Sequence, residues 1–330
     1  MNLKLKEMKY EELLKLSKEI KQQLYETMEK EVIEKKQREI YFTENGTYIC
    51  HKCGGTHTCK AGFNKQRKQR YKCHDCNKIM IAQQATITFS SKKKLSQWIC
   101  FTQSMLDGDS LYVSAEKANI SKRTAFRWRH KLLYILQYLL NQEVLEDITY
   151  LDETLFSLVD KNPKAKHVKE EKKRGMSNQK INVTCAIDSK SNTIIKVVDR
   201  GRVTSKSLIE VYEGKIKKGS KVVSDSLRSY HKLMQQLEID WKKIPSKKKS
   251  IEEYTLEPIN KLHSQIDDFF FKYKGISVKY LQGYLALFDY QRKHSNHHRN
   301  KVFLSMIEDI FTGFGHLRCV DIDSGAPIYS

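Results

Sequence analysis

An apolar, β-branched stretch from Asp147 to Val159 carries an aspartate, Asp152, in its middle, with Glu153 beside it. The stretch has the composition of a buried strand. A carboxylate inside such a strand is costly unless it is paired or binds a metal. We therefore predict that Asp152 is a ligand in a metal-dependent nuclease site and that its strand lies in the core of a catalytic domain.

The segments after this strand alternate between strand and helix patterns. Strands are expected at 181–187, 193–198, 221–225 and 239–244, and helices at 205–215, 230–237, 258–273 and 277–293. With the Asp152 strand first, the order is β-β-β-α-β-α-β-α, that of a ribonuclease-H-like domain with a mixed sheet. In that layout the first strand and the end of the fourth are neighbours, which brings Asp225 next to Asp152.

Two neighbouring carboxylates repel each other unless a cation lies between them, and oxygen ligands suit Mg²⁺ or Mn²⁺. Such ions can activate a water or a 3′-hydroxyl and stabilise the leaving oxygen in phosphoryl transfer. The third ligand stays open. On the predicted helix 258–273, Asn260, His263 and Asp267 share one face, and none of them is a glutamate. Hard-cation binding alone ranks Asp267 close to His263. The opposite, buried face consists of Leu262, Ile266, Phe269 and Tyr273.

The charge balance indicates a polyanionic partner. Lys and Arg number 60 against 39 Asp and Glu, a net charge of +21, which suits double-stranded DNA or another nucleic acid. No stretch approaches the roughly 18 apolar residues of a membrane span, and the N-terminus has no signal-peptide pattern. We expect a cytoplasmic protein with no membrane partner, in which the eight cysteines are reduced.

Four of these cysteines form two pairs, Cys50-His-Lys-Cys53 and Cys73-His-Asp-Cys76, separated by nineteen residues. This spacing predicts a structural Zn²⁺ site with four thiolate ligands. Redox dithiols are the alternative. Four further residues are near enough to substitute as ligands: His51, His57, Cys59 and His74. The basic residues expected of a ribbon lying on DNA phosphates are Lys60, Lys65, Arg67, Lys68, Arg70 and Lys72.

Residues 111–139 have the pattern of a helix-turn-helix, preceded by a predicted helix over 95–106. Ser121 is placed to cap the second helix of the motif. Arg123, Arg127 and His130 lie opposite that helix's apolar side at 100° per residue, so we expect these three to contact DNA in the major groove. An ordinary amphipathic core helix with a solvated face is the alternative.

These segments predict a multidomain α+β protein. The expected parts are an N-terminal helical segment at 1–45, a zinc ribbon at 46–90, a helix-turn-helix region at 91–142, the catalytic domain at 143–300 and a C-terminal tail at 301–330. The first contains a charged amphipathic helix over residues 8–40, which either self-associates or packs on its own domain. A basic loop is expected at 161–174.

The chain resembles the bacterial insertion-sequence DDE transposases of the group numbered fifteen ninety-five, over roughly residues 48–293. That group joins a zinc ribbon and a helix-turn-helix to a ribonuclease-H-like domain. The matching motifs are the two cysteine pairs, Asp152-Glu-Thr154, Val223-Ser-Asp225, Asn260-Lys-Leu-His263-Ser264, and Gly275-Ile-Ser-Val-Lys-Tyr-Leu281 followed by Tyr284.

The resemblance implies a transposase that binds terminal inverted repeats, cleaves the ends and joins the 3′-hydroxyls to target DNA with Mg²⁺ or Mn²⁺. Many members carry Glu at the position of His263, three residues after an Asn, so the resemblance favours His263 over Asp267 beside Asp152 and Asp225. Paired ends imply a homodimer or higher assembly on DNA. A DNA-binding protein without cleavage, or a structure-specific nuclease of the same fold, is the alternative.

Overall fold

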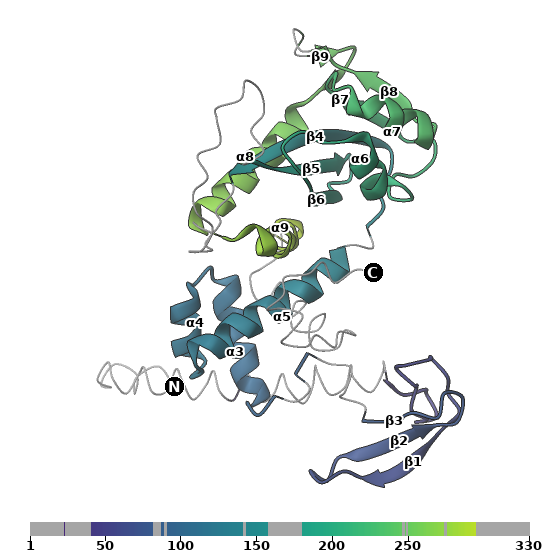
Figure 1. Ribbon diagram of the computed structural model, residues 1–330, viewed down its shortest axis with the longest axis vertical. Helices are drawn as coiled ribbons and strands as arrows, with labels where there is room; N and C mark the ends of the chain where they lie inside the picture. The colour runs from purple at the N-terminus through teal and green to yellow at the C-terminus, as the bar shows by residue number, and fades with distance from the viewer. Residues whose placement is uncertain are drawn as a thin grey trace, which may run out of the picture. The chain divides into compact units, whose positions relative to one another are not determined.

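The computed structural model describes residues 41–81, 87–88, 91–140, 143–157, 180–245, 248, 250–273 and 276–294, together with Gln23 (Figure 1). They fall into two units, one running to Ile135 and the other starting at Leu136. Apart from Gln23, the predicted N-terminal helix lies outside the described residues, as do the basic loop 161–174 and the tail 301–330. In the parts that the structure describes, no helix is long and apolar enough to cross a membrane.

The first unit contains a small antiparallel sheet in the region of the paired cysteines. Its order is β1-β2-β3, with β1 at Thr58–Phe63, β2 at Gln69–Cys73 and β3 at Ile79–Met80. A cluster of buried side chains packs with it, namely Tyr41, Tyr48, Cys50, Cys73 and Met80. So small a core does not stabilise a domain by apolar burial alone, and domains of this size commonly depend on a metal or on disulfides.

Three helices follow: α3 (Leu95–Leu106), α4 (Leu111–Lys117) and α5 (Lys122–Leu140), and the second unit begins within α5, at Leu136. Ser110 caps α4 by accepting the Val113 backbone N–H. Ser121 Oγ accepts the Thr124 backbone N–H at 3.2 Å, the contact expected of a cap for α5. The Trp98 and Trp128 rings stack at 3.7 Å, which ties α5 to α3. All three helices lie where the sequence predicted helices.

The second unit is built on a five-stranded mixed sheet of order β6-β5-β4-β7-β8. The strands are β4 (Ile148–Ser157), β5 (Lys180–Asp188), β6 (Thr193–Arg200), β7 (Lys221–Ser224) and β8 (Asp240–Lys243). Strands β4, β5 and β6 form an antiparallel meander, whereas β7 pairs parallel with β4, and β8 parallel with β7. The predicted strand order and the pairing of the first strand with the fourth are confirmed.

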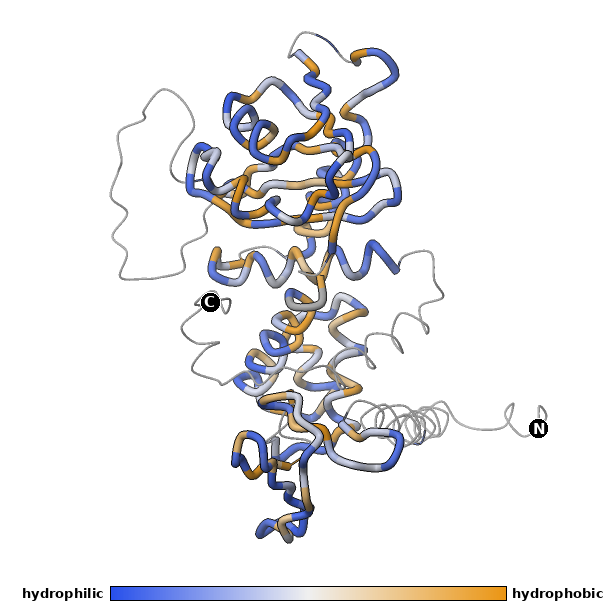
Figure 2. The backbone as a smooth tube through the Cα atoms, turned by 90° about the vertical axis from the view of Figure 1, so that its right-hand side faces the viewer, coloured by the Kyte–Doolittle hydropathy of each residue, from blue (hydrophilic) through white to orange (hydrophobic). Residues whose placement is uncertain are grey.

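Helices cover both faces of this sheet (Figure 1). Helices α6 (Ser205–Tyr212) and α7 (Ser229–Leu237) share one core cluster with Leu151 of β4. Helices α8 (Glu257–Lys272) and α9 (Val278–Lys293) share the other cluster with Val183 and Cys185 of β5. Figure 2 shows apolar residues along the strands between these layers. A short hairpin of β9 (Ser250–Ile251) and β10 (Tyr254–Thr255) precedes α8 and was not predicted.

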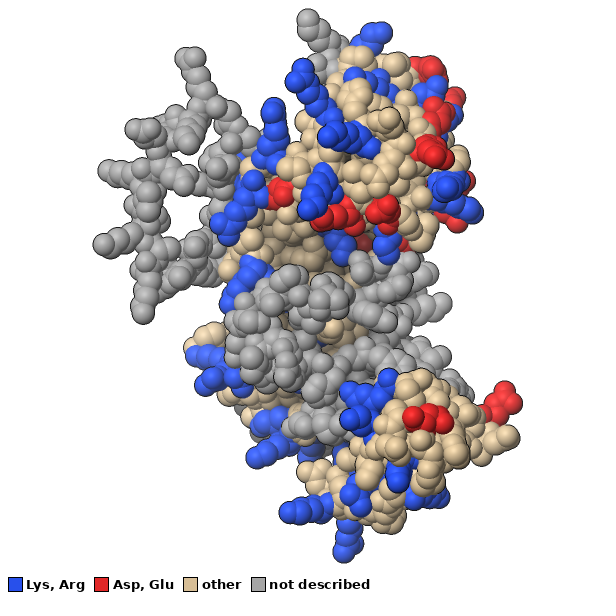
Figure 3. Space-filling view, turned by 45° about the vertical axis from the view of Figure 1, so that its right-hand side comes forward, with Lys and Arg blue, Asp and Glu red and all other residues tan. Residues whose placement is uncertain are grey.

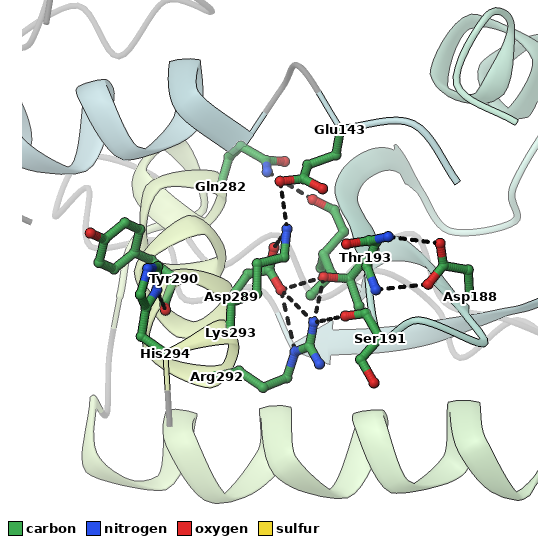
Figure 4. Close-up of polar contacts among 12 residues, drawn as sticks. Glu143, Asp188, Ser191, Thr193, Gln282, Asp289, Tyr290, Arg292, Lys293 and His294 are labelled. Carbon is green, nitrogen blue, oxygen red and sulfur yellow. Dashed lines mark hydrogen bonds and ion pairs between the residues drawn. The ribbon is translucent and has the colours of Figure 1, made fainter. Parts of the chain in front are cut away.

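A buried polar network holds α9 against the turn between β5 and β6 (Figure 4). Asp289 is 3% exposed and accepts hydrogen bonds from Thr193 and from Arg292, the latter at 3.1 Å. Arg292 also donates to the Ser191 carbonyl at 2.8 Å. Lys293 forms ion pairs with Asp289 at 3.3 Å and with Glu143 at 3.1 Å. The Asp289 carboxylate is therefore compensated by two cations although it lies in the core.

Candidate functional site

Asp152 lies on β4, the central strand of the sheet, and is partly buried. Its Oδ1 accepts the backbone N–H of Glu153 at 2.9 Å. The pKa of Asp152 is raised to about 6: burial is the main cause and the nearby charge of Asp225 adds to it, against the lowering effect of that backbone hydrogen bond. A cation bound at this carboxylate would offset both the burial and the repulsion.

Asp225 follows the last residue of β7 directly. The parallel register pairs Leu151 with Ser224, so Asp152 and Asp225 come next on two adjacent strands. The Leu227 backbone N–H donates to Asp225 Oδ1 at 2.9 Å, which orients the carboxylate. The two aspartates predicted as neighbours from strand order are thus brought together.

His263 lies on α8 and points toward Asp152, with 4.0 Å between its Nδ1 and Asp152 Oδ2. Its side chain is 16% exposed, and its Nε2 is buried without a hydrogen-bond partner. Burial lowers the pKa of His263, partly offset by the Asp267 charge, so the neutral imidazole with a free lone pair is favoured. Asn260 and Asp267, the other two candidates on this helix, are exposed.

Asp152, Asp225 and His263 therefore supply two carboxylates and one neutral imidazole. Carboxylate oxygens are the ligands that Mg²⁺ and Mn²⁺ prefer, while a ring nitrogen suits a transition metal such as Mn²⁺ better than Mg²⁺. The raised pKa of Asp152 indicates a carboxylate that a cation would compensate, and His263 Nδ1 faces this carboxylate at 4.0 Å. This donor set fits a divalent cation, and it fits Mn²⁺ better than Mg²⁺.

Glu153 is a second buried carboxylate that the sequence analysis did not assign. It follows Asp152, so the alternation of a strand points it to the opposite face, where α6 and α7 pack. Tyr230 of α7 donates its hydroxyl to Glu153 Oε1 at 2.6 Å. Burial raises the pKa of Glu153 to about 8, against the lowering effect of the Tyr230 hydrogen bond. The sequence places Glu153 next to Asp152, which was the only sign of a second buried carboxylate. Its hydrogen-bond partner Tyr230 lies 77 residues further along the chain, so sequence spacing could not identify it.

The four paired cysteines converge in the first unit, where their sulfur atoms all lie within 4.8 Å of one another. The Sγ atoms are 3.7 Å apart for Cys50 and Cys76, and 3.6 Å apart for Cys53 and Cys73. Tetrahedral zinc with Zn–S bonds of about 2.3 Å requires sulfur separations of roughly 3.8 Å. The cluster is compatible with a structural Zn²⁺ ion.

Two glycines follow Cys53 in this cluster. Gly54 has a φ of +76°, which favours glycine. A Cβ atom on Gly55 would lie 2.0 Å from Asp75 Oδ2, so the exposed Asp75 side chain would have to move to accept it. The residues considered as substitute ligands make other contacts: His51 Nδ1 lies 2.7 Å from the Tyr48 hydroxyl, His74 Nε2 lies 3.3 Å from Cys59 Sγ, and His57 Nδ1 lies 3.7 Å from Asp75 Oδ1. The compact sulfur group consists of the two CxxC pairs alone among the described residues.

On α5, the three residues expected to face DNA do not share one exposed face. Arg123 is exposed and Arg127 is half-buried, but His130 is only 8% exposed and its ring lies 4.4 Å from that of Phe126. The predicted exposure of His130 is wrong because α5 has a wider buried side than its leucine stripe suggested. Leu133, three residues after His130, is 1% exposed.

Residues 140–293 match the model of one protein family, described as the ISXO2-like transposase domain. No curated protein matches the chain. Among solved structures, a pre-cleavage Mos1 transpososome is 12% identical with a TM-score of 0.25, covering 63% of this chain and 74% of its own. The Mos1 strand transfer complex is also 12% identical, with a TM-score of 0.28, covering 64% of this chain and 74% of its own.

Proposed function

We propose that the chain is a DNA transposase, because residues 140–293 match the model of the ISXO2-like transposase domain. It would bind the terminal inverted repeats of an insertion sequence, cleave the ends and join the 3′-hydroxyls to target DNA. The observation that carries this proposal is the convergence of three groups: Asp152 on β4, Asp225 after β7, and His263 on α8 with its Nδ1 4.0 Å from Asp152.

In this proposal Asp152, Asp225 and His263 hold the catalytic cation. A divalent cation held by these three residues would supply activation of the attacking oxygen and stabilisation of the leaving oxygen of the phosphodiester. The backbone orients the two carboxylates: the Glu153 N–H donates to Asp152, and the Leu227 N–H donates to Asp225. His263 is held neutral by burial, so its lone pair is available without loss of a proton.

The first unit would supply DNA binding. We propose that Cys50, Cys53, Cys73 and Cys76 hold a structural Zn²⁺ and that Arg123 and Arg127 at the start of α5 contact DNA. The net charge of +21 supports a polyanionic partner. We further propose a homodimer or larger assembly on DNA, since joining two ends requires both to be held at once.

An end-cleavage and strand-transfer assay tests this function. The substrate is a duplex carrying the inverted repeat that flanks the coding region, with Mg²⁺ or Mn²⁺. Asp152→Asn and Asp225→Asn should each reduce cleavage and joining to background while end binding persists. Asp240→Asn, which changes an exposed aspartate of β8, is the matched control and should leave activity unchanged. Full strand transfer by both active-site variants would refute the mechanism.

His263 favours one alternative, a protein of the same fold that binds DNA without cutting it. Imidazole is a weaker ligand than carboxylate for a hard cation, and the family resemblance implies glutamate as the more usual residue at this position. Normal end binding by the wild type, combined with no cleavage in either Mg²⁺ or Mn²⁺, would support this alternative over a transposase.

A further inference from the structure

The hairpin of β1 and β2 presents an ordered loop. Asn64 Oδ1 accepts the backbone N–H groups of Gln66 and Lys68 at 2.9 and 2.8 Å. Two backbone hydrogen bonds, from Asn64 to the Lys68 carbonyl and from Arg67 to the Asn64 carbonyl, close the loop at 3.0 Å each. The loop is therefore preorganised, and a partner need not supply the free energy of ordering it.

The register separates this loop from the cysteine cluster. Thr58 pairs with Cys73 at the cluster end, and Phe63 pairs with Gln69 at the loop end. At about 3.4 Å per residue, the five steps from Thr58 to Phe63 correspond to roughly 17 Å. Side-chain changes at the loop end should therefore leave the cysteine cluster intact.

The hairpin carries basic residues and no acidic ones, because no Asp or Glu occurs between Asn45 and His74. The cations around the loop are Lys60, Lys65, Arg67, Lys68 and Arg70. Figure 3 shows Lys and Arg atoms at the lower end of the view, where the sheet of β1, β2 and β3 lies (the ribbon). Such a surface complements a phosphate backbone.

One large apolar side chain lies among these cations. Phe63, the last residue of β1, is 64% exposed. The chain bulges between Lys60 and Phe63, and Gln69 Nε2 donates to the Gly62 carbonyl at 2.9 Å beside the bulge. An exposed phenylalanine on an ordered β-hairpin lowers solubility, and its apolar ring does not contribute to binding phosphates.

We propose that this hairpin enters a groove of duplex DNA and that the Phe63 ring inserts against the bases as an apolar wedge. The surrounding lysines and arginines bind the flanking phosphates. Proteins that carry basic arms into the minor groove often place an apolar side chain between base steps, which partly unstacks and kinks the duplex. DNA as the partner rests on the proposed function, whereas the wedge is a separate property of the ribbon.

The test uses the full-length, zinc-loaded chain and a 30-base-pair duplex labelled at both ends, so that anisotropy reports affinity and energy transfer reports bending. Phe63→Ala should weaken binding by about fivefold to a hundredfold, the range for loss of an aromatic contact with a base. It should also abolish the bend. The dependence of log K on log salt should not change, because no phosphate contact is removed.

Three variants sharpen the result. Lys65→Ala should reduce the salt slope by about one, Phe63→Trp should keep both affinity and bend, and Ile79→Ala should change neither. Ile79 is the matched control because it is also apolar and 54% exposed on the same ribbon. Binding and bending by Phe63→Ala equal to the wild type would overturn the wedge and leave the proposed function standing. A wild type that binds no DNA would overturn both.

Discussion

Replacing Glu153 with glutamine should stabilise the second unit, and by more as the pH rises. Burial raises the pKa of Glu153 to about 8 from an ordinary value of 4.5. The folded state therefore binds the proton more tightly than the unfolded chain, and it carries more bound protons between these two pKa values. The free energy of unfolding of the wild type must fall as pH rises through this window. A glutamine escapes this loss because it does not ionise.

The size of the effect follows from the separation of the two pKa values. Each pKa unit corresponds to about 1.4 kcal/mol, so with folded and unfolded values of about 8 and 4.5 the glutamine should stabilise by about 1 kcal/mol at pH 5 and about 3 kcal/mol at pH 7. Glutamine keeps an oxygen to accept the Tyr230 hydroxyl, so the 2.6 Å hydrogen bond is retained.

Hydrogen exchange of the β4 and β5 amides measures this stability without requiring the two units to unfold together. The buffers contain no added Mg²⁺ or Mn²⁺, since a cation near Asp152 would lower the pKa of Glu153. Glu210→Gln is the control because Glu210 is exposed on α6, and its effect should be small at every pH. If Glu153→Gln destabilised the sheet at pH 7, or stabilised it equally at pH 5 and pH 7, Glu153 would be ionised in the fold and the reasoning would be wrong.

Three further outcomes are expected. Removing zinc with a chelator should weaken DNA binding while exchange protection of strands β4 to β8 persists. Unfolding of that sheet on chelation would contradict an independent second unit. Arg127→Ala should weaken binding to end-bearing duplex more than to random duplex in a gel shift, and an equal loss on both would indicate a phosphate contact only. Arg292→Met should destabilise the second unit by about 3 kcal/mol or more, because it removes a partner of the buried Asp289. Lys206→Met, which changes an exposed side chain of α6, should have little effect in the same denaturant titration.

The strands could be predicted because they depend on local patterns, and the proximity of Asp152 and Asp225 followed from the order of those elements, which is that of a ribonuclease-H-like domain. Apolar runs bounded by turns define the strands, and the order of strands and helices restricts which of them become neighbours. The cysteine cluster follows from spacing alone, since two short loops with this separation can reach one ion.

Other features depend on packing that no local pattern encodes. The sequence offered three candidates for the third residue of the site, because Asn260, His263 and Asp267 share one helix face. The packing of α8 on the sheet turns His263 toward Asp152. His130 is buried because α5 packs on more than one side, which a single leucine stripe does not reveal. The β9–β10 hairpin was missed because strands of two residues have no detectable period.

Cleavage of an end-bearing duplex by His263→Ala, compared with Asp267→Ala and the wild type, tests the proposed site most directly. His263 lies 4.0 Å from Asp152 Oδ2, and Asp267 is exposed on the same helix. We expect the His263 variant to lose cleavage in both Mg²⁺ and Mn²⁺ while it still binds the ends, and the Asp267 variant to cleave like the wild type. Full cleavage by His263→Ala together with loss of cleavage by Asp267→Ala would contradict the assignment of His263 as the third residue of the site.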